Sequence, residues 1–425
     1  MPSNGRQIAI EVLRRVSTQG AFASSALRAA FSEAPDLPAA ERGLATEIVY
    51  GVLRRRGFLD RALKQASGRP IKDLNPKLHD LLRAGAYQLL YLDRVPAHAV
   101  VDTAVEMAKK RGGPKAAGAT NAILRKLSAL PPEARIPKPV PLAKDPVRSV
   151  AEQAGLPHRL AELLVADLGP ETALAFALAS LESAPLTLRA NRRRTTQEAL
   201  AEEVGGEPGS LPYSVRLPGR THALPSDLPS VREGRASPQD DASMRVVALL
   251  DPQPGERILD VCSAPGGKTC DIAERMNDTG TVIAHDRLPE RLKRVDENAA
   301  RLGLSIIQST DLLPPEDELF DRVLVDAPCS GLGTLRRHPE IRWRFTTEDL
   351  ANLTRTQAKV LADGAKRLKT GGVLVYSVCT VTKAEGEAQI RALGEEFQRE
   401  AVLQTGPHQE GAPDGFFAAR LVKHG

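Results

Sequence analysis

The spacing of apolar residues over the first 130 positions predicts a bundle of helices. Apolar side chains recur every three to five residues between positions 41 and 56, which places them on one helix face: Leu44, Ile48, Val49, Val52 and Leu53. The same spacing returns further on, at Leu78, Leu82, Leu89 and Leu90, and more weakly at Val100, Ala104 and Ala108. Breaks between helices are expected at Gly57, Gly112 and Gly113. Residues 1–130 are therefore expected to form an all-α domain.

A proline-rich segment follows this region and indicates a linker. Six prolines fall between positions 131 and 146, and regular helices do not pass through such a run, so residues 131–147 are predicted to connect two domains. Residues 148–235 then mix two kinds of pattern. Residues 157–178 and 195–204 have helical spacing, whereas residues 185–191 resemble a strand and a turn. A small α+β insert is expected here.

The pattern changes again beyond Asp251, where short apolar runs alternate with helical stretches. The runs at 257–261, 281–286, 321–326 and 372–377 are predicted strands, and residues 269–276, 289–302 and 349–368 are predicted helices. Such alternation is typical of a parallel, doubly wound sheet. Residues 236–425 are therefore expected to form an α/β, Rossmann-like domain. In such sheets ligands bind at the carboxyl ends of the strands, where Asp260, Asp286 and Asp326 all fall.

The charge of the chain is concentrated at its front. Residues 1–145 hold 24 Lys and Arg against 13 Asp and Glu, a net of +11, whereas the rest of the chain holds 34 against 40. This asymmetry suggests a module that binds a polyanion joined to a near-neutral catalytic module, although a solvated Arg-rich helical surface would give the same excess. No apolar run is long enough to span a bilayer, and the first ten residues have no signal core. A cytoplasmic protein without a membrane partner is expected.

The cysteines and histidines give no indication of a metal site. All four cysteines lie in the C-terminal half, and none of their spacings resembles a paired zinc site: Cys262, Cys270, Cys329 and Cys379. Disulfides are not expected in a reducing compartment. The histidines at 98, 285 and 338 are scattered, so we expect neither a metal nor a disulfide framework.

A strand, an acid and a glycine-rich turn that opens a helix predict a cofactor site. Asp260 is followed by Cys262-Ser263-Ala264-Pro265-Gly266-Gly267-Lys268-Thr269. Paired glycines let a ligand approach the backbone, the helix N-terminus offers N–H groups to a carboxylate, and Lys268 adds a cation. The spacing fits neither a P-loop nor GxGxxG. Asp286 is placed to accept hydrogen bonds from ribose hydroxyls, and Asp311 could meet an adenine amine. One such acid alone is more often a helix N-cap, but three around this turn favour a cofactor.

Two cysteines also fall at strand ends. Cys329 follows the strand that ends at Asp326, and Cys379 follows the predicted strand at 372–377. A single cysteine is more often a small buried hydrophobe, and we assign that structural role to Cys262 and Cys270. Two cysteines on the rim that faces the ligand instead suggest a reactive thiol, because an activated cysteine serves as a covalent nucleophile.

The motifs DVCSAPGGKT, DAPCSGLGT and YSVCT together resemble the NOL1/NOP2/Sun family of RNA cytosine-C5 methyltransferases. Further likeness lies in Gln239-Asp240 with Ser243 and in Asp414-Gly415-Phe416-Phe417. The front domain resembles a NusB-like RNA-binding bundle through Tyr50-Gly51-Val52, Gly85-Ala86-Tyr87-Gln88-Leu89 and Asn121-Ala122-Ile123-Leu124-Arg125, among others. The resemblance covers nearly the whole chain and is weakest over residues 131–235. A NusB-like front joined to this core is similar to bacterial members of the family that act on 16S rRNA.

The resemblance implies a cofactor, a substrate and a role for each site residue. S-adenosylmethionine would lie with its methionine end against Cys262, Ser263, Ala264, Pro265, Gly266, Gly267 and Lys268, its ribose at Asp286 and its adenine at Asp311. Cys379 would add to C6 of a cytosine that has left its stack, so that C5 can attack the methyl group. Asp326 would stabilise the adduct at the edge of the cofactor, and Cys329 would assist release. One departure concerns Glu385-Gly386-Glu387, where the family often has Glu-Asn-Glu, and puts a polar contact from Gly386 in doubt.

Other functions fit part of the same pattern. A DNA cytosine-C5 methyltransferase would use Cys329 as the nucleophile, but it normally carries a large recognition insert, and fewer than 50 residues follow Cys379. A tRNA or other RNA cytosine-C5 methyltransferase would share the whole site. A non-catalytic RNA-binding or antitermination factor would need neither cysteine nor the glycine turn. We expect an rRNA cytosine-C5 methyltransferase that acts as a monomer.

Overall fold

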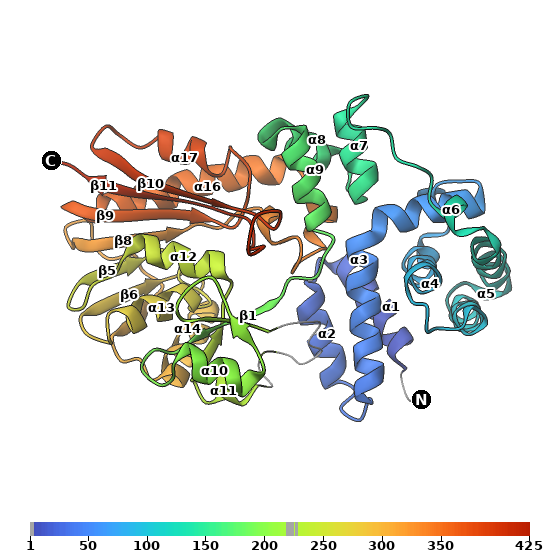
Figure 1. Cartoon of the computed structure of the whole chain (residues 1–425), viewed down its shortest axis with the longest axis horizontal. Coiled ribbons are helices and arrows are strands. Elements are labelled where there is room, and N and C mark those ends of the chain that lie inside the picture. The colour runs from blue at the N-terminus through green and yellow to red at the C-terminus, as the bar shows by residue number, and fades with distance from the viewer. Residues whose placement is uncertain (1–3, 218–224, 226–227) are drawn as a thin grey trace. The chain divides into compact units, whose positions relative to one another are not determined.

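The computed structural model describes residues 4–217, 225 and 228–425, and the chain folds into two units (Figure 1). The first unit comprises Met1–Leu181 and His338–Arg344, and the second comprises Glu182–Arg337 and Phe345–Gly425. The boundary near Leu181 lies inside the segment predicted as the α+β insert. Parts of the predicted front domain and insert (1–3, 218–224 and 226–227) lie outside the described residues. The division into four parts at 130, 147 and 235 stays a prediction.

Helices make up the first unit, as the apolar spacing predicted. Two short 3₁₀ turns, Ile71–Asp73 and Pro76–Leu78, precede α4. The helices are α1 (Gly5–Gln19), α2 (Ala23–Ser32), α3 (Ala39–Ser67), α4 (His79–Tyr91), α5 (Ala97–Ala129), α6 (Pro132–Arg135), α7 (Pro146–Ala154), α8 (His158–Leu168), α9 (Pro170–Ala179) and α15 (Ile341–Arg344).

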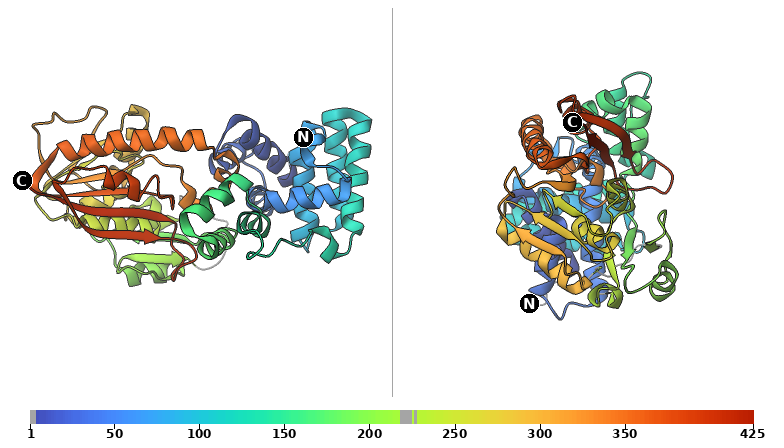
Figure 2. Two further views of the ribbon diagram at one scale, coloured as in Figure 1. Left: turned by 90° about the horizontal axis from the view of Figure 1, so that it is seen from above. Right: turned by 90° about the vertical axis from the view of Figure 1, so that its left-hand side faces the viewer.

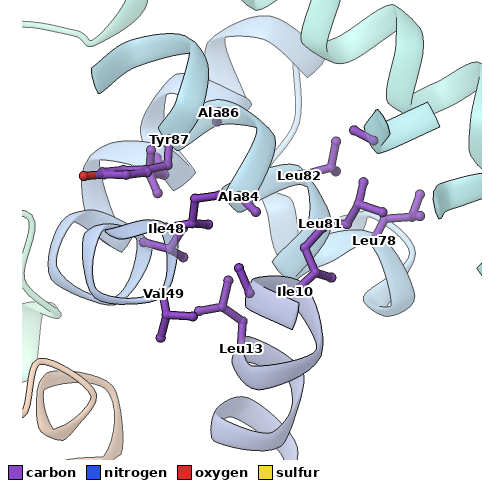
Figure 3. Packing of buried hydrophobic residues seen from close by; sticks show 14 of the residues in the cluster. Ile10, Leu13, Ile48, Val49, Leu78, Leu81, Leu82, Ala84, Ala86 and Tyr87 are labelled. Carbon is purple, nitrogen blue, oxygen red and sulfur yellow. The ribbon is translucent and has the colours of Figure 1, made fainter. Parts of the chain in front are cut away.

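The core of this unit lies where α1, α3 and α4 meet, with buried side chains from each helix pointing toward one another (Figure 3). Tyr87 of α4 packs its ring against Gly51 of α3, at a place where any side chain on residue 51 would overlap the ring. The Tyr87 hydroxyl donates a hydrogen bond of 2.6 Å to Glu47 Oε1. Two segments that resemble a NusB-like bundle, around Gly51 and around Tyr87, are therefore in direct contact.

One of the predicted helix breaks is absent from the structure, and another is present. The break expected at Gly57 was wrong, because α3 runs on to Ser67. Gly57 instead gives room for the carbonyl of Gly155, which a Cβ at position 57 would overlap. A break does occur at Gly113, whose φ of 74° and ψ of −168° kink α5. Prolines in the expected linker begin helices rather than prevent them, because a proline at the first helical position needs no N–H partner; α6 begins at Pro132 and α7 at Pro146.

The second unit contains a small antiparallel sheet and a large mixed sheet. The small sheet has the strand order β2-β3-β1-β4. Its elements, with the helices between them, are β1 (Leu186–Ala190), α10 (Gln197–Val204), β2 (Glu207–Pro208), β3 (Ser214–Leu217), α11 (Pro229–Arg232) and β4 (Ala236–Pro238).

The large sheet has the order β10-β11-β9-β8-β5-β6-β7, of which β9-β8-β5-β6-β7 are parallel. Its elements are α12 (Asp241–Leu250), β5 (Arg257–Asp260), α13 (Gly267–Arg275), β6 (Thr281–His285), α14 (Pro289–Leu302), β7 (Ile307–Thr310), β8 (Phe320–Asp326), the 3₁₀ turn Leu332–Thr334, α16 (Thr347–Lys366), β9 (Leu368–Val378), α17 (Glu387–Arg391), β10 (Phe397–Thr405) and β11 (Phe416–Lys423). The predicted doubly wound domain is confirmed. The sequence patterns did not predict the antiparallel edge formed by β10 and β11.

Helices cover both faces of this sheet. One core joins α12, α13 and α14 to residues such as Ile258 and Leu324, and the other joins α16 and α17 to residues such as Leu259 and Val325. Figure 2 shows the long α16 lying along its face of the strands. Alternate strand residues thus serve opposite cores. Because β5, β6 and β8 are parallel, their carboxyl ends, with Asp260, Asp286 and Asp326 at or next to them, meet along one edge of the sheet.

Candidate active site

The glycine-rich turn between β5 and α13 carries buried polar atoms that fit a polar ligand. Gly266 has a φ of 97°, which favours glycine, and a Cβ there would lie 3.0 Å from the Val295 Cα of α14. Asp260 is buried, and its Oδ2 accepts a hydrogen bond of 2.7 Å from Thr269 Oγ1. The other oxygen of Asp260 and the hydroxyl of Ser263 are buried without a partner among the described residues. A ligand with an ammonium and a carboxylate would satisfy both the acid and the helix N-terminus.

Burial raises the pKa of Asp260 to about 7 in the folded protein, and the nearby Asp326 adds to the rise. The folded state therefore holds a proton more tightly than the unfolded state does, so the free energy of unfolding should fall as the pH rises from 4 to 7. Up to about 4 kcal/mol of this fall comes from Asp260 alone. We expect the cofactor-free Asp260→Asn variant to lose less stability over this window in urea unfolding. Burial also raises the pKa of Asp271 to about 7. Because Asp271 is present in both the unchanged protein and the variant, its contribution to the pH dependence is the same in both and does not affect the difference. Equal slopes would contradict the assignment.

Two further acids line the same edge of the sheet. Asp286 is buried just beyond β6, where its Oδ1 accepts a hydrogen bond of 3.1 Å from the Leu288 N–H and its Oδ2 pairs with Arg291 at 3.0 Å. The acid thus closes the turn before α14 and pairs with an arginine of that helix. Asp311 follows β7 and is exposed. A pocket of about 290 Å³ beside the glycine turn is lined by Ala264, Pro265, Glu290, Arg291 and Arg294. The pocket thus lies beside the glycine turn, and Arg291, the partner of Asp286, forms part of its wall.

Asp326 and Lys268 form an ion pair that joins the glycine turn to β8. Lys268 Nζ lies 2.7 Å from Asp326 Oδ2, and Ser377 Oγ donates a hydrogen bond of 2.6 Å to Asp326 Oδ1. Burial acts to lower the pKa of Lys268, but the interaction with Asp326 outweighs it and leaves that pKa above its ordinary value. Lys268 also interacts electrostatically with Cys379 and lies 5.2 Å from the centre of the Phe416 ring. The amine is therefore fixed between cofactor turn, acid and cysteine.

The two rim cysteines lie against each other. Their Sγ atoms are 3.2 Å apart, and both cysteines are only partly exposed. The hydrogen bond between Cys329 and Cys379, together with burial, raises the pKa of Cys329 well above its ordinary value, which keeps the Cys329 thiol protonated at neutral pH. Burial likewise raises the pKa of Cys270 to about 12 and that of Cys262 still further. The structure thus brings Cys329 and Cys379 together and leaves Cys262 and Cys270 apart as unreactive thiols.

Glu385 is a site residue that the sequence analysis named only as a neighbour of Gly386. Its buried carboxylate accepts hydrogen bonds from Ser330 and Thr380, the residues that directly follow the two rim cysteines. The only signal in the sequence was an acid placed six residues after Cys379, which by itself indicates nothing about contacts.

Gly386 explains the departure from the family pattern. The ring of Phe417 packs over this glycine, so that a Cβ at position 386 would lie 2.8 Å from the ring's Cγ. We therefore expect Gly386→Asn to lower the free energy of unfolding by about 1–3 kcal/mol, because the ring must move. Urea unfolding measures the difference, with Gly118→Asn as a control, since nothing lies within 4 Å of a Cβ at Gly118. A neutral Gly386→Asn variant would show that the ring moves at no cost.

A second residue missed from the sequence is Arg189 of β1. Its side chain is fully buried and pairs with Glu274 through contacts of 2.8 and 3.2 Å. The same guanidinium donates a hydrogen bond of 3.0 Å to the carbonyl of Gly267 and another to Gln239 Oε1. Arg189 thus ties the small sheet to the glycine turn. A single arginine within the apolar strand 186–190 was the available signal.

The other motif segments also meet in space. The Arg337 guanidinium lies 2.7 Å from Asp240 Oδ2 and 2.5 Å from Asp414 Oδ2, and the Asp414 N–H donates to Asp240 Oδ1 at 3.1 Å. Arg337, which follows β8 and Cys329 in the chain, therefore joins the Gln239-Asp240 segment to the Asp414-Gly415 segment.

Neither metal ligands nor a membrane span emerge from the described residues. No group of His, Cys, Asp and Glu side chains among them is arranged to hold a metal ion. Within the same part of the chain, every helix is too short or too polar to cross a bilayer.

Comparison with known proteins finds a related family for each of the two units. A model of the family described as 16S rRNA methyltransferase RsmB/F matches residues 247–422, and a model of the NusB family matches residues 3–129. The chain is 35% identical over 450 residues to a Synechocystis protein named probable ribosomal RNA small subunit methyltransferase B, covering 99% of both chains. The crystal structure of PH0851 superposes with a TM-score of 0.82 at 26% identity, covering 100% of this chain and 99% of that one. NSun6 from Pyrococcus horikoshii, crystallised with SFG, shares the fold with a TM-score of 0.57 at 22% identity, covering 63% of this chain and 98% of that one.

The fold and the glycine turn, taken with these matches, define an S-adenosylmethionine-dependent methyltransferase that acts on ribosomal RNA. The chain belongs to the RsmB/F family of rRNA methyltransferases, with a NusB domain in front. The family and fold expected from the sequence motifs are thereby confirmed.

Proposed function

We propose that the protein methylates C5 of a cytosine in 16S rRNA through a covalent adduct with Cys379. The observation that carries this proposal is the pair of sulfur atoms 3.2 Å apart, next to the Lys268–Asp326 ion pair. C5 and C6 of a cytosine are bonded to each other. Two sulfurs at this separation can therefore lie next to these two carbons of one base at the same time. Neither a binding module nor a simple N- or O-methyltransferase needs such a pair.

The cofactor supplies an electrophilic methyl group when it is bound at residues 262–268, Asp286 and Asp311. Cys379 Sγ, as the thiolate, adds to C6 and breaks the C5–C6 double bond, which makes C5 nucleophilic. Asp326 holds N3 and the exocyclic amine and passes to N3 a proton that Lys268 donates to the carboxylate. After methyl transfer the C5 proton passes to solvent water and the C5–C6 double bond re-forms. The Sγ–C6 bond breaks, so that Cys379 leaves as the thiolate, and N3 returns its proton through Asp326 to Lys268. Cys329 assists this release.

The different environments of the two thiols support this assignment. The thiolate is the nucleophilic form of cysteine, and the raised pKa of Cys329 disfavours that form. A thiol that stays protonated can donate a hydrogen bond to the departing sulfur of Cys379, 3.2 Å away, and so stabilise that thiolate during release. Cys379, at the end of β9 and within the field of Lys268, suits the attack.

The front domain binds the RNA. Its excess of lysine and arginine over acids is +11 across residues 1–145, and such cations bind phosphates without reading the base sequence. Affinity should therefore fall steeply as salt rises, because bound counterions are released. The small sheet, held to the glycine turn by Arg189, would place the RNA next to the base pocket.

The test is transfer of a radiolabelled methyl group from S-adenosylmethionine to purified 16S rRNA. Nuclease digestion and chromatography should recover the label as 5-methylcytidine. Transfer RNA and 23S rRNA serve as competing substrates, and preferential labelling of transfer RNA would favour the alternative RNA substrate. Label in another nucleoside would rule out the cytosine-C5 proposal and leave the methyltransferase assignment intact.

A further inference from the structure

Five side-chain and backbone donors converge on one buried carboxylate behind the two cysteines. Glu385 Oε1 accepts hydrogen bonds from the Ser330 N–H at 2.7 Å and from Gln357 Nε2 at 3.1 Å. Its Oε2 accepts from the hydroxyls of Ser330 at 2.6 Å, Thr382 at 2.8 Å and Thr380 at 3.1 Å. Glu385 is fully buried. The donors come from four places in the chain: the Cys329 loop, α16, the Cys379 loop and the turn before α17.

The two cysteine loops depend on this carboxylate to different degrees. Cys379 directly follows β9, whose last residue, Val378, is paired with Phe417 of β11, so the sheet itself fixes the loop. Cys329 lies three residues beyond the end of β8, outside the ladder. Two of the five hydrogen bonds to Glu385 hold Ser330, and Gln357 donates to the Pro328 carbonyl at 2.9 Å as well. Backbone hydrogen bonds from the Ala327 N–H to the Ser377 carbonyl at 2.9 Å and from the Gly333 N–H to the Cys379 carbonyl at 3.0 Å hold the two ends of this loop. Between those ends, Glu385 and its partners hold the residues next to Cys329.

We propose that Glu385 is a positioning residue that keeps the Cys329 thiol against Cys379, so that the enzyme can release the base after methyl transfer. The inference rests on the proposed covalent mechanism and adds to it a residue that contacts neither base nor cofactor. Attack by Cys379 does not need Glu385, because β9 holds that loop. Release does need it, because the second thiol must stay beside the attached base.

Two substitutions distinguish the positioning role of the Glu385 side chain from an effect of its negative charge. Glu385→Ala removes the acceptor that all five donors share and loosens the Cys329 loop. Glu385→Gln keeps an oxygen for the two N–H donors, and its amide can donate to hydroxyls, which accept as readily as they donate. We expect Glu385→Ala to lower turnover on the order of 10- to 100-fold, as small misplacements of reacting groups do, and to accumulate the covalent RNA adduct as Cys329→Ala does. Glu385→Gln should stay within a few-fold of the unchanged protein and show no accumulation.

A matched control removes a carboxylate at the opposite edge of the same sheet. Glu256 directly precedes β5 and accepts hydrogen bonds from Arg322 Nε at 2.7 Å and from the Gln253 N–H at 2.8 Å. Glu256→Ala should change thermal stability without adduct accumulation. If Glu385→Ala does not fold, Ser330→Ala takes its place. That variant removes one hydroxyl donor, keeps the carboxylate, and should show the same accumulation to a smaller extent.

The experiment follows each variant on denaturing gels with labelled 16S rRNA and S-adenosylmethionine, together with cross-linking by dibromobimane. This reagent fluoresces when it bridges two nearby thiols and needs neither RNA nor cofactor. Slower bridging in Glu385→Ala together with a persistent adduct is the expected result. The inference is overturned if Glu385→Ala turns over and bridges normally, if it forms no adduct at all, or if Glu385→Gln is equally defective. Slow bridging of Glu385→Ala with no adduct in any variant, Cys329→Ala included, would overturn the covalent mechanism instead.

Discussion

Replacement of Cys379 by alanine is expected to abolish methyl transfer to 16S rRNA and to leave no covalent protein–RNA adduct. Without a thiolate at C6, the C5 carbon of cytosine stays a poor nucleophile. The neighbouring Cys329 is not expected to replace the attacking sulfur, because its raised pKa disfavours the thiolate. Loss of a covalent nucleophile lowers kcat by roughly 10⁴-fold or more. Label incorporation and denaturing gels measure both consequences. Calorimetric binding of S-adenosylmethionine should be little changed, since the glycine turn is intact.

The partner cysteine supplies the matched control, because its Sγ lies only 3.2 Å away. Cys329→Ala removes a thiol of the same size from the adjacent position, yet the expected result is opposite: attack and methyl transfer proceed once, and the protein stays attached to the RNA. An inert, adduct-free Cys329→Ala beside an active Cys379→Ala would reverse the two roles and would match the DNA-type mechanism.

The order of elements in the catalytic domain could be predicted because its strands and helices have clear periods. The strand predicted at 321–326 is β8 (Phe320–Asp326), and the helix predicted at 289–302 is α14 (Pro289–Leu302). Strand β10 was missed because it lies at the sheet edge with many exposed residues, and its burial does not repeat cleanly. Gly57 was misjudged because a glycine that serves close helix packing looks the same in sequence as one that ends a helix.

The part of the site that could be predicted is the part that depends on the direction of the strands. Asp260, Asp286 and Asp326 could be placed at one edge because parallel strands end together. The 3.2 Å contact between Cys329 and Cys379 was not predictable, because it depends on how two loops 50 residues apart fold over Glu385. Arg189 was missed for a related reason: its partners, Glu274 and Gly267, lie about 80 residues away, so that only packing reveals the ion pair.

Asp326→Asn is expected to lower kcat by about 10²- to 10⁴-fold, the usual range for loss of a group that transfers a proton. An asparagine can keep the local geometry, with its oxygen toward Lys268 and its amide toward the Ser377 hydroxyl. It cannot accept the Lys268 proton and pass it to N3, so the negative charge left on the base by thiolate addition is not neutralised. Adduct formation should slow together with methyl transfer, while affinity for S-adenosylmethionine changes little.

The same strand offers the control for this prediction. Asp321, near the opposite end of β8, also pairs with a lysine, Lys369 Nζ at 2.6 Å, and accepts a hydrogen bond of 2.8 Å from the Arg257 N–H. Asp321→Asn therefore removes a carboxylate of similar exposure from another lysine ion pair of the same strand and should leave kcat unchanged. Equal losses in both variants would mean that Asp326 acts through the stability of the strand. A loss confined to Asp326→Asn, with adduct and product falling in parallel, assigns the proton transfer to the Lys268–Asp326 pair, because the two carboxylates differ chiefly in which edge of the sheet they face.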